Sequence, residues 1–328
     1  MRAHWQTLVS DRYRTGFIMT IAACIMWAFS GIGAEYLFTT SNIVPEWLVV
    51  LRLFLSAAIM LGICRIKYGK DVYKPLKDIK NYKYLLFYAI FGVAFCQFSY
   101  FKVISLSNAG TGTVLEFFSP VFILLWFALS SRTLPSKSAM LACLCAIVGI
   151  FFVATGGDFT SLKISERTLL WGLLAAITTA IYTIAPTKLF ESFPTDLILA
   201  WAFLIGGIVL APLVQPWQHT PQITGQQWFV AIFVTIIMGT VITSNLFMIG
   251  IKSIGATKAG LYATIEPLVA SILTVVLFNT SFSLGQALGS MLILLVPFVM
   301  ELKALPRMIK AYQAKRTSKH KQTAIRKI

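Results

Sequence analysis

The chain has 328 residues, of which 57% are hydrophobic and only 12% are charged, and its formal net charge is +16. A typical soluble domain is roughly 25% charged, so this chain is too apolar to cover a water-exposed surface. The composition excludes a soluble globular protein and predicts that many apolar side chains face lipid.

Ten apolar stretches are long enough to be membrane-spanning helices, which need about 20 residues to cross the hydrocarbon core. Their ranges are 16–38, 46–66, 83–105, 109–130, 138–155, 168–189, 196–214, 227–250, 257–278 and 284–302. Transmembrane strands alternate apolar and polar residues, whereas runs such as LLFYAIFGVAFCQF are continuously apolar. We therefore predict an all-α integral membrane protein with ten transmembrane helices.

The first predicted span contains Trp27, Ser30 and Glu35. A secretory signal peptide has an apolar core of about 7–15 residues that is followed by a small-residue cleavage site. The apolar run here is longer and no such site follows it, so we predict that this segment is kept as a transmembrane helix.

Five ionisable side chains stand out within the predicted spans, where a charge costs on the order of 2.5–3.5 kcal/mol and needs a partner or a role. In chain order they are Glu35, Arg52, Lys102, Glu116 and Glu266. We place the first four at a similar depth, in the outer third of the bilayer, and their charges sum to zero. An arginine fork suits a half-buried carboxylate, so we expect Arg52 to pair with Glu35 or Glu116. Lys102 can extend to the membrane interface.

Glu116 and Glu266 each lie near a proline inside a span, Pro120 and Pro267 respectively. Freed backbone carbonyls and cavities are tolerated beside such prolines. Desolvation favours the neutral form of a carboxylate, which is what a proton-coupled step requires. The two glutamates are therefore candidates for binding a proton or a cationic substrate, and structural hydrogen bonding is the alternative.

Further polar and aromatic residues in the spans complete a candidate substrate cavity. They are Trp27, Ser30, Gln97, Tyr100, Tyr182, Trp201 and Asn245. The competing interpretation is that the aromatic members face lipid or the membrane interface. Small residues more often permit close helix crossing in membranes, and we assign that role to Gly110, Gly112, Ala256 and Gly260.

The cysteines and histidines do not indicate a metal site. The five cysteines lie within or at the ends of spans, and the three histidines lie outside them. A zinc site needs ligand pairs at loop spacings, and these are absent. We predict that the cysteines act as small buried apolar residues and that the protein needs no metal or cofactor.

Basic residues are concentrated on alternate connections between the spans. The segment from Arg65 to Lys83 is rich in lysine, and nine further basic residues follow from Lys303 to Lys327. The opposite side retains only Lys102, Lys163 and Arg167. The positive-inside rule then places both termini in the cytoplasm, with the protein in the plasma membrane. The basic tail suggests anionic lipid headgroups rather than nucleic acid as its contact.

The two halves of the chain carry the same pattern. SNAGTGTVLEFFSPVF (107–122) aligns with IGATKAGLYATIEPLV (254–269), and IAACIMWAFSGIGAEYLF (21–38) aligns with LLAAITTAIYTIAPTKLF (173–190). These alignments pair Ser30 with Tyr182, Trp27 with Thr179, and Gln97 with Ser244. Five spans per half is an odd number, which forces the two halves to be inverted relative to each other.

The predicted organisation follows from this duplication. The first five-helix repeat covers 15–155, a connecting loop covers 156–167, the second repeat covers 168–302, and a basic cytoplasmic tail covers 303–328. The loop is short enough for the two halves to pack as one bundle, so a monomer is sufficient, although an oligomer is not excluded.

The paired blocks resemble the drug/metabolite transporter superfamily, and within it the EamA family. The resemblance rests on the 27–30 segment, Arg52 in RLFLSAA, the small-residue opening before SPVF, and IEPLV in the second half. It implies a ten-helix inverted-repeat carrier with a substrate cavity between the halves. The chain departs from the family where a Gly-Glu pair often follows the fourth and ninth helices: Ser131-Arg132 and Asn279-Thr280 stand there instead.

The function that we infer is secondary active transport of a small organic metabolite, such as an amino acid, an amine or a drug-like compound, by alternating access. Proton coupling is the preferred driving force, followed by facilitated diffusion or exchange. The sequence contains no Walker A motif, no HExxH and no GxSxG, which argues against an ATP-driven pump or an integral membrane enzyme. A lipid-linked sugar flippase or a channel is the main alternative.

Overall fold

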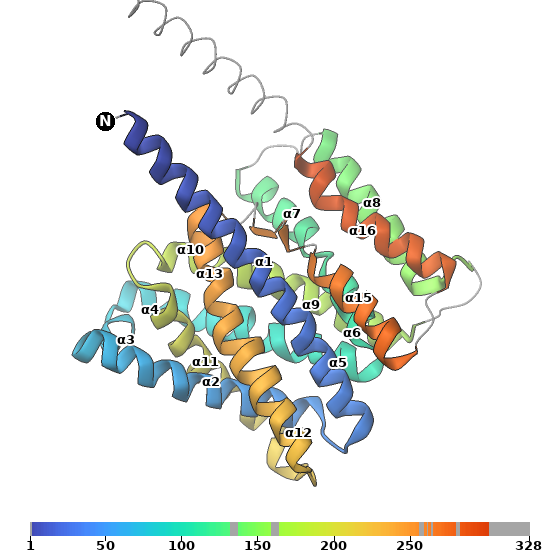
Figure 1. Ribbon diagram of the computed structural model, residues 1–328, viewed down its shortest axis with the longest axis horizontal. Coiled ribbons are helices and arrows are strands. Elements are labelled where there is room, and N and C mark those ends of the chain that lie inside the picture. The colour runs from blue at the N-terminus through green and yellow to red at the C-terminus, as the bar shows by residue number, and fades with distance from the viewer. Residues whose placement is uncertain are drawn as a thin grey trace, which may run out of the picture.

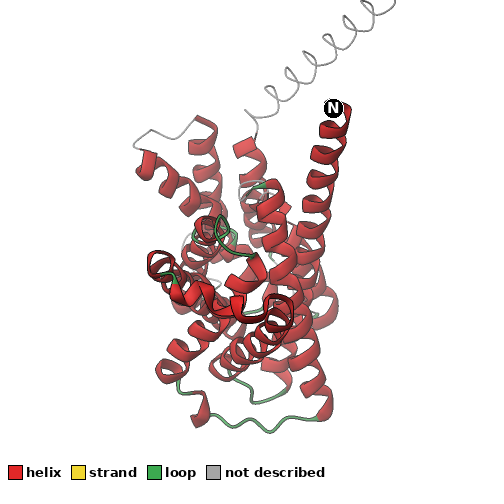
Figure 2. Cartoon of the chain, turned by 90° about the vertical axis from the view of Figure 1, so that its left-hand side faces the viewer, coloured by secondary structure: helices red, strands yellow, loops and turns green. Residues whose placement is uncertain are grey.

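The computed structural model describes residues 2–131, 137–158, 164–255, 259–260, 262–263, 265–279 and 283–301. In these residues the chain forms helices and short connections and contains no strand (Figure 2). Six helical segments within them are long and apolar enough to cross a membrane. They are Tyr13–Thr40, Pro45–Lys77, Ile79–Leu106, Glu166–Leu189, Thr195–Val214 and Gly225–Ile254. The predicted all-helical architecture is confirmed.

The count of ten spans stays a prediction. The segments Ala109–Ile123, Ile265–Phe278 and Leu284–Leu295 are apolar helices, but they are shorter than the other six. The predicted tail at 303–328 and part of the predicted connecting loop, 159–163, lie outside the described residues. The sequence places the first span at 16–38, whereas the helix that contains it begins at Arg2.

The first half of the chain consists of ten helical elements (Figure 1). They are α1 (Arg2–Thr40), α2 (Pro45–Tyr68), η1 (Gly69–Tyr73), α3 (Lys74–Lys77), α4 (Ile79–Phe87), η2 (Tyr88–Ala94), α5 (Phe95–Leu106), α6 (Ala109–Glu116), α7 (Ser119–Ser131) and α8 (Lys137–Thr155). Polar caps fix several starts. The Asn108 side chain accepts a hydrogen bond from the Thr111 N–H at 2.7 Å at the start of α6, and Asp78 caps α4 in the same way.

The described elements of the second half follow a similar order. They are α9 (Glu166–Ile184), α10 (Pro186–Leu189), α11 (Thr195–Val214), η3 (Pro216–Gln218), α12 (Gly225–Phe229), η4 (Val230–Ile242), α13 (Thr243–Ile254), α15 (Ile265–Phe278) and α16 (Leu284–Glu301). A capping box between Thr224 and Gln227 starts α12. Ser165 caps α9 by accepting from the Thr168 N–H at 3.1 Å.

Two long spans contain a π-helical stretch, in which each backbone bond reaches one residue further than in an α-helix. One is η2, between α4 and α5, and the other is η4, between α12 and α13. Thr240 follows the wider spacing, because its hydroxyl donates to the Thr235 carbonyl at 2.9 Å. Such bulges occur frequently at functional sites, since they redirect the side chains that follow.

The helix that carries SPVF is interrupted immediately before its proline. Helix α6 ends at Glu116 and α7 begins at Ser119, with Phe117 and Phe118 in the turn between them. Pro120 lacks an N–H and cannot join the hydrogen-bond ladder of a continuous helix. The interruption places the Glu116 side chain at a helix end rather than in the middle of a span.

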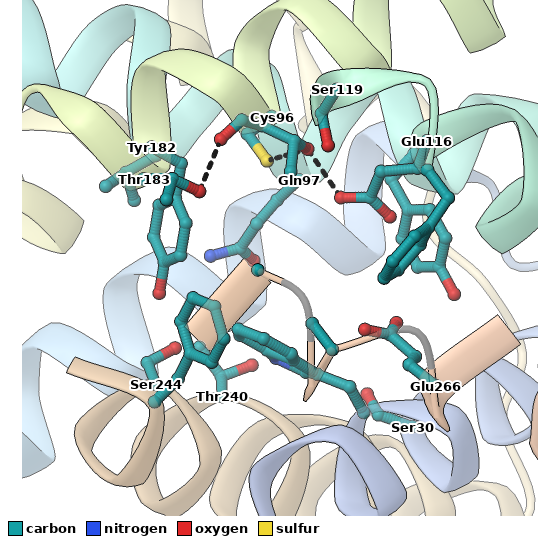
Figure 3. A pocket seen from close by; sticks show the side chains of 18 of the residues that line it. Ser30, Cys96, Gln97, Glu116, Ser119, Tyr182, Thr183, Thr240, Ser244 and Glu266 are labelled. Atoms are coloured by element: carbon teal, nitrogen blue, oxygen red, sulfur yellow. Dashed lines mark hydrogen bonds between the residues drawn. The ribbon is translucent and has the colours of Figure 1, made fainter. Parts of the chain in front are cut away.

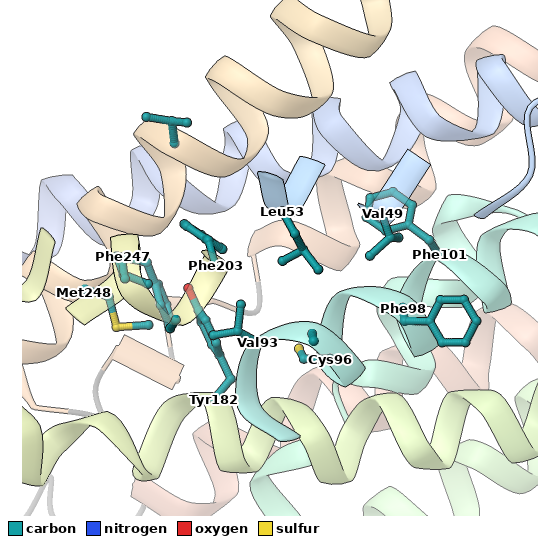
Figure 4. Close-up of a cluster of buried hydrophobic side chains, with 14 of the residues drawn as sticks. Val49, Leu53, Val93, Cys96, Phe98, Phe101, Tyr182, Phe203, Phe247 and Met248 are labelled. Carbon is teal, nitrogen blue, oxygen red and sulfur yellow. The ribbon is translucent and has the colours of Figure 1, made fainter. Parts of the chain in front are cut away.

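The helices pack into one bundle around a buried apolar cluster (Figure 4). Val49 and Leu53 of α2 contact this cluster, as do Phe101 of α5, Phe203 of α11 and Phe247 of α13. Around it, α1 packs on α13 and η4, α9 packs on α5 and η2, and α2 packs on α11. Helices α8 and α16 pack together at one side of the bundle (Figure 1).

Candidate functional site

A cavity lies between the helices of the two halves and is lined by side chains from both (Figure 3). The space open to the centres of water-sized molecules is about 100 Å³. One water needs only about 10–15 Å³ on this measure, so the cavity has room for a small organic molecule or several waters. Its polar and charged lining residues are Ser30, Arg52, Gln97, Tyr100, Glu116, Ser119, Thr179, Tyr182, Thr183, Thr240, Ser244 and Glu266.

Two carboxylates enter the cavity from different halves of the chain. Glu116 comes from the end of α6 and Glu266 from the first turn of α15 (Figure 3). The Thr179 hydroxyl donates a hydrogen bond to Glu116 Oε1 at 2.5 Å, and the Cys96 thiol lies 3.2 Å from the same hydroxyl. Glu266 is only 7% exposed, and no described residue donates a hydrogen bond to its carboxylate.

Aromatic rings form another wall of the cavity. Trp27 lies 4.8 Å from Phe247 and 6.3 Å from Tyr182, measured between ring centroids, and Tyr182 stacks on Tyr88 at 5.9 Å. These separations are typical of favourable aromatic pairs. The wall offers an apolar surface, and its ring faces attract cations.

Arg52 is 3% exposed and lines the same cavity. Its Nη2 donates to the Thr240 hydroxyl at 2.6 Å, and its guanidinium lies 4.2 Å from the centre of the Phe101 ring. No described acidic residue forms an ion pair with it, so the predicted pairing with Glu35 or Glu116 is wrong. Lys102 instead forms an ion pair with Glu46, at 2.5 Å.

Comparison with known proteins identifies the family. The model of the EamA-like transporter family matches the chain twice, over residues 14–155 and 166–300. The chain belongs to the EamA-like transporter family.

Two bacterial proteins that are similar to this chain are named as transporters. The chain is 33% identical to "Uncharacterized inner membrane transporter YicL" of Salmonella typhimurium, over 86% of this chain and 93% of that protein. It is 27% identical to "Uncharacterized transporter YwfM" of Bacillus subtilis, over 72% of this chain and 79% of that protein. Such similarity indicates a multi-pass membrane transporter with a small-molecule substrate rather than an enzyme.

A solved crystal structure has the same fold. It superposes with a TM-score of 0.60 at 18% identity, and the match covers 88% of this chain and 96% of the other. At this level of identity the match concerns the fold alone.

Of the ten candidate site residues predicted from the sequence, eight line the cavity. They are Trp27, Ser30, Arg52, Gln97, Tyr100, Glu116, Tyr182 and Glu266. The cavity therefore brings together most of the candidate residues that the sequence singled out. Their roles in binding or coupling stay predictions.

Two candidates lie elsewhere. Glu35 follows Trp27 by eight residues, which is about 12 Å along a helix, and its carboxylate accepts a hydrogen bond from the Ala109 N–H at 2.8 Å. Asn245 follows the cavity residue Ser244, but it does not line the cavity, and its amide donates to the Val241 carbonyl of η4 at 2.7 Å. Trp201, which we also placed in the cavity, donates from Nε1 to the Val72 carbonyl at 2.7 Å.

Several lining residues were not singled out from the sequence as site residues. The repeat alignment pairs Thr179 with Trp27 and Ser244 with Gln97. Because Trp27 and Gln97 were predicted to line the cavity, the alignment could have predicted the same for Thr179 and Ser244. Thr240 and Cys96 carry no comparable signal, because a single threonine or cysteine in a span is usually a packing residue.

Proposed function

We propose that this EamA-family protein is a secondary active transporter of a small organic metabolite, such as an amino acid, an amine or a drug-like compound. It works by alternating access to the cavity, and protons drive the cycle. The observation that carries the proposal is the cavity itself, which is lined by both halves of the chain and contains two carboxylates, one half-buried and one buried, beside an aromatic wall. A midplane site at the interface of two repeats is the general plan of such carriers.

The packing of the helices supports two inverted five-helix repeats. Helix α1 packs on α13 and η4, and α9, its counterpart, packs on α5 and η2. Likewise α2 packs on η4 while α11 packs on η2, and the pairs α2–α11 and α8–α16 each join equivalent helices. A two-fold relation between the halves generates these paired contacts.

Two close helix crossings support the same relation. The proline alignment pairs Gly92 with Gly239, and the first-helix alignment pairs Tyr182 with Ser30. A Cβ atom at Gly92 would lie 3.3 Å from the Tyr182 Cα, and a Cβ atom at Gly239 would overlap the Ser30 side chain. Equivalent glycines therefore meet equivalent residues, and small residues allow such close approach in membranes.

With five spans in each repeat, the same two-fold relation gives ten spans and puts both termini on one side of the membrane, which we propose is the cytoplasm because the segment from Lys303 to Lys327 is basic. The lysine-rich connection that contains η1 and α3 then faces the cytoplasm, and the loop that contains η3 faces outward.

Cysteine labelling tests this orientation in a variant that lacks the five native cysteines. Lys70→Cys and Gln222→Cys place single thiols at exposed positions on the two connections. We expect an impermeant maleimide to label Gln222→Cys in intact cells. Lys70→Cys should be labelled only after the cells are opened. Labelling of both positions from outside would refute the inverted arrangement.

Reconstitution tests the transport function. Proteoliposomes with an internal pH dye are supplied with amino acids, amines, nucleosides or sugars under an imposed pH gradient. We expect at least one class to move protons across the membrane at a rate well above that of protein-free liposomes, and to accumulate against its own gradient. If the substrate only equilibrates across the membrane, without accumulating and without moving protons, the protein catalyses facilitated diffusion and proton coupling is refuted.

A further inference from the structure

The connection from the end of α2 to α4 carries positive charge that its own acidic residues do not balance. Between residues 65 and 83 the chain has seven basic residues and two acidic ones, Asp71 and Asp78. Asp71 pairs with Lys74 at 2.8 Å, Asp78 caps α4, and Lys67 pairs with an aspartate of α11. The other five basic side chains are exposed and form no ion pair with a described acidic residue. They are Arg65, Lys70, Lys77, Lys80 and Lys83.

The backbone that carries these charges is held against the bundle. Trp201 of α11 donates from Nε1 to the Val72 carbonyl at 2.7 Å, and Val72 itself is only 3% exposed. Asp196, also in α11, accepts from Lys67 Nζ at 2.8 Å and from the Tyr68 hydroxyl at 2.9 Å. The short helices η1, α3 and α4 thus present the lysines from a fixed backbone at the end of α2 (Figure 1). Less chain entropy is lost when such a preorganised surface binds a ligand.

Exposed apolar side chains lie among the charges. Ile66 is 89% exposed and Ile79 is 80% exposed, and Tyr73 is 46% exposed. Ile63, about one turn before Ile66 in the spanning helix α2, is 54% exposed. The basic surface therefore continues directly from the exposed apolar surface of a span. Aromatic and basic residues gather at the depth of the lipid headgroups, and exposed isoleucines there can contact acyl chains instead of water.

We propose that the 65–83 connection is a binding surface for anionic phospholipids of the cytoplasmic leaflet. The five basic side chains without acidic partners contact the headgroup phosphates, and Ile66 and Ile79 contact the adjoining acyl chains. The leaflet follows from the orientation proposed above. The inference goes beyond the transport function and does not depend on which molecule the cavity binds.

Charge complementarity favours an anionic lipid over a zwitterionic one. Each basic residue close to an anionic membrane surface strengthens binding by about fivefold. A soluble acidic partner would meet the lysines but would leave the isoleucines beside the span without an apolar contact. The equivalent connection of the second half, residues 215–227, contains no lysine or arginine. Selectivity for anionic lipid is therefore expected at one face of the protein only.

Lipid binding to the purified full-length protein in detergent tests the inference. Native mass spectrometry follows titrations with dioleoyl phosphatidylglycerol and dioleoyl phosphatidylcholine, which have the same acyl chains. Phosphatidylglycerol should bind at least about 10-fold more tightly at low salt. This preference should shrink as salt is added, because exposed charges are screened. Phosphatidylglycerol should also raise the Tm more than phosphatidylcholine does, since a ligand of the folded state stabilises it.

Lysine variants then assign the lipid to this surface. Lys70→Gln, Lys77→Gln and Lys80→Gln in one chain should weaken phosphatidylglycerol binding by about 10- to 100-fold and leave phosphatidylcholine binding unchanged. Arginine at the same three positions keeps the charge and should keep the preference. All three side chains are exposed, so neither variant removes a buried contact.

A control variant removes the same charge elsewhere. Arg14→Gln, Lys137→Gln and Arg167→Gln change three exposed positions on other helices and should keep the preference for phosphatidylglycerol. The inference is refuted if the wild type binds both lipids equally, or if the triple lysine variant loses no more of the preference than this control does. Salt-sensitive dimerisation that the triple lysine variant abolishes would assign the surface to a second copy of the chain and would refute it as well.

Discussion

Replacing Glu116 with Gln should abolish accumulation of substrate driven by a pH gradient, and Glu266→Gln should do the same. Both carboxylates line the cavity, and each comes from a different half of the chain. A glutamine side chain has nearly the same shape but cannot take up or release a proton, so any cycle that alternates protonation with substrate occupancy stops. In proteoliposomes, gradient-driven uptake should fall to the level of protein-free vesicles.

The two variants should differ in what they retain. Glu116→Gln keeps an oxygen that can accept from the Thr179 hydroxyl, so substrate binding and substrate-for-substrate exchange should survive while proton coupling is lost. Glu266→Gln also removes an anionic group that receives no hydrogen bond from the described residues, so the binding of a cationic substrate should itself weaken. Glu191→Gln, at an exposed position after α10, is the matched control and should behave as wild type. Undiminished proton-coupled flux in the double variant would remove both glutamates from the mechanism.

Most of the residues that line the cavity could be predicted from the sequence. Polar residues are costly in spans, and repeat alignment identifies equivalent depths, so Glu116, Gln97 and Tyr182 were recognisable. Depth does not specify which face of a helix a residue occupies. Asn245 illustrates this limit: it is adjacent to the cavity residue Ser244, yet it points away from the cavity because successive residues differ by about 100° around a helix.

The partner of Arg52 was beyond the reach of sequence reasoning for a different reason. Complementary charges at similar depth favoured an ion pair with Glu35 or Glu116. Thr240 accepts from the arginine instead, and it lies in η4, where the π-helical spacing rotates every later side chain relative to a regular α-helix. The η4 sequence, VAIFVTIIMGTVI, contains no sign of that extra rotation.

For Glu35 the sequence and the structure indicate different roles, and the two roles predict different effects of mutation. The sequence groups it with the coupling residues, whereas the structure places it at the start of α6, where its carboxylate accepts from the Ala109 N–H. The Thr274 hydroxyl of α15 lies 3.4 Å from the same oxygen, and Thr274 in turn accepts from the Gly110 N–H at 3.2 Å. A negative charge at a helix N-terminus is favourable. Glu35 therefore joins α1, α6 and α15 as a structural contact.

Glu35→Ala should consequently destabilise the protein by about 1–3 kcal/mol, because it leaves a buried backbone donor without this acceptor. Glu35→Gln keeps an oxygen and should cost less. Thermal unfolding in detergent measures both, and Thr187→Ala, at the aligned and exposed position of the second half, is the control that should change little. The pH dependence of transport should be unaffected in Glu35→Gln. If proton coupling is lost while stability is unchanged, Glu35 takes part in proton movement. The role predicted from its charge and its depth in the membrane would then be the correct one.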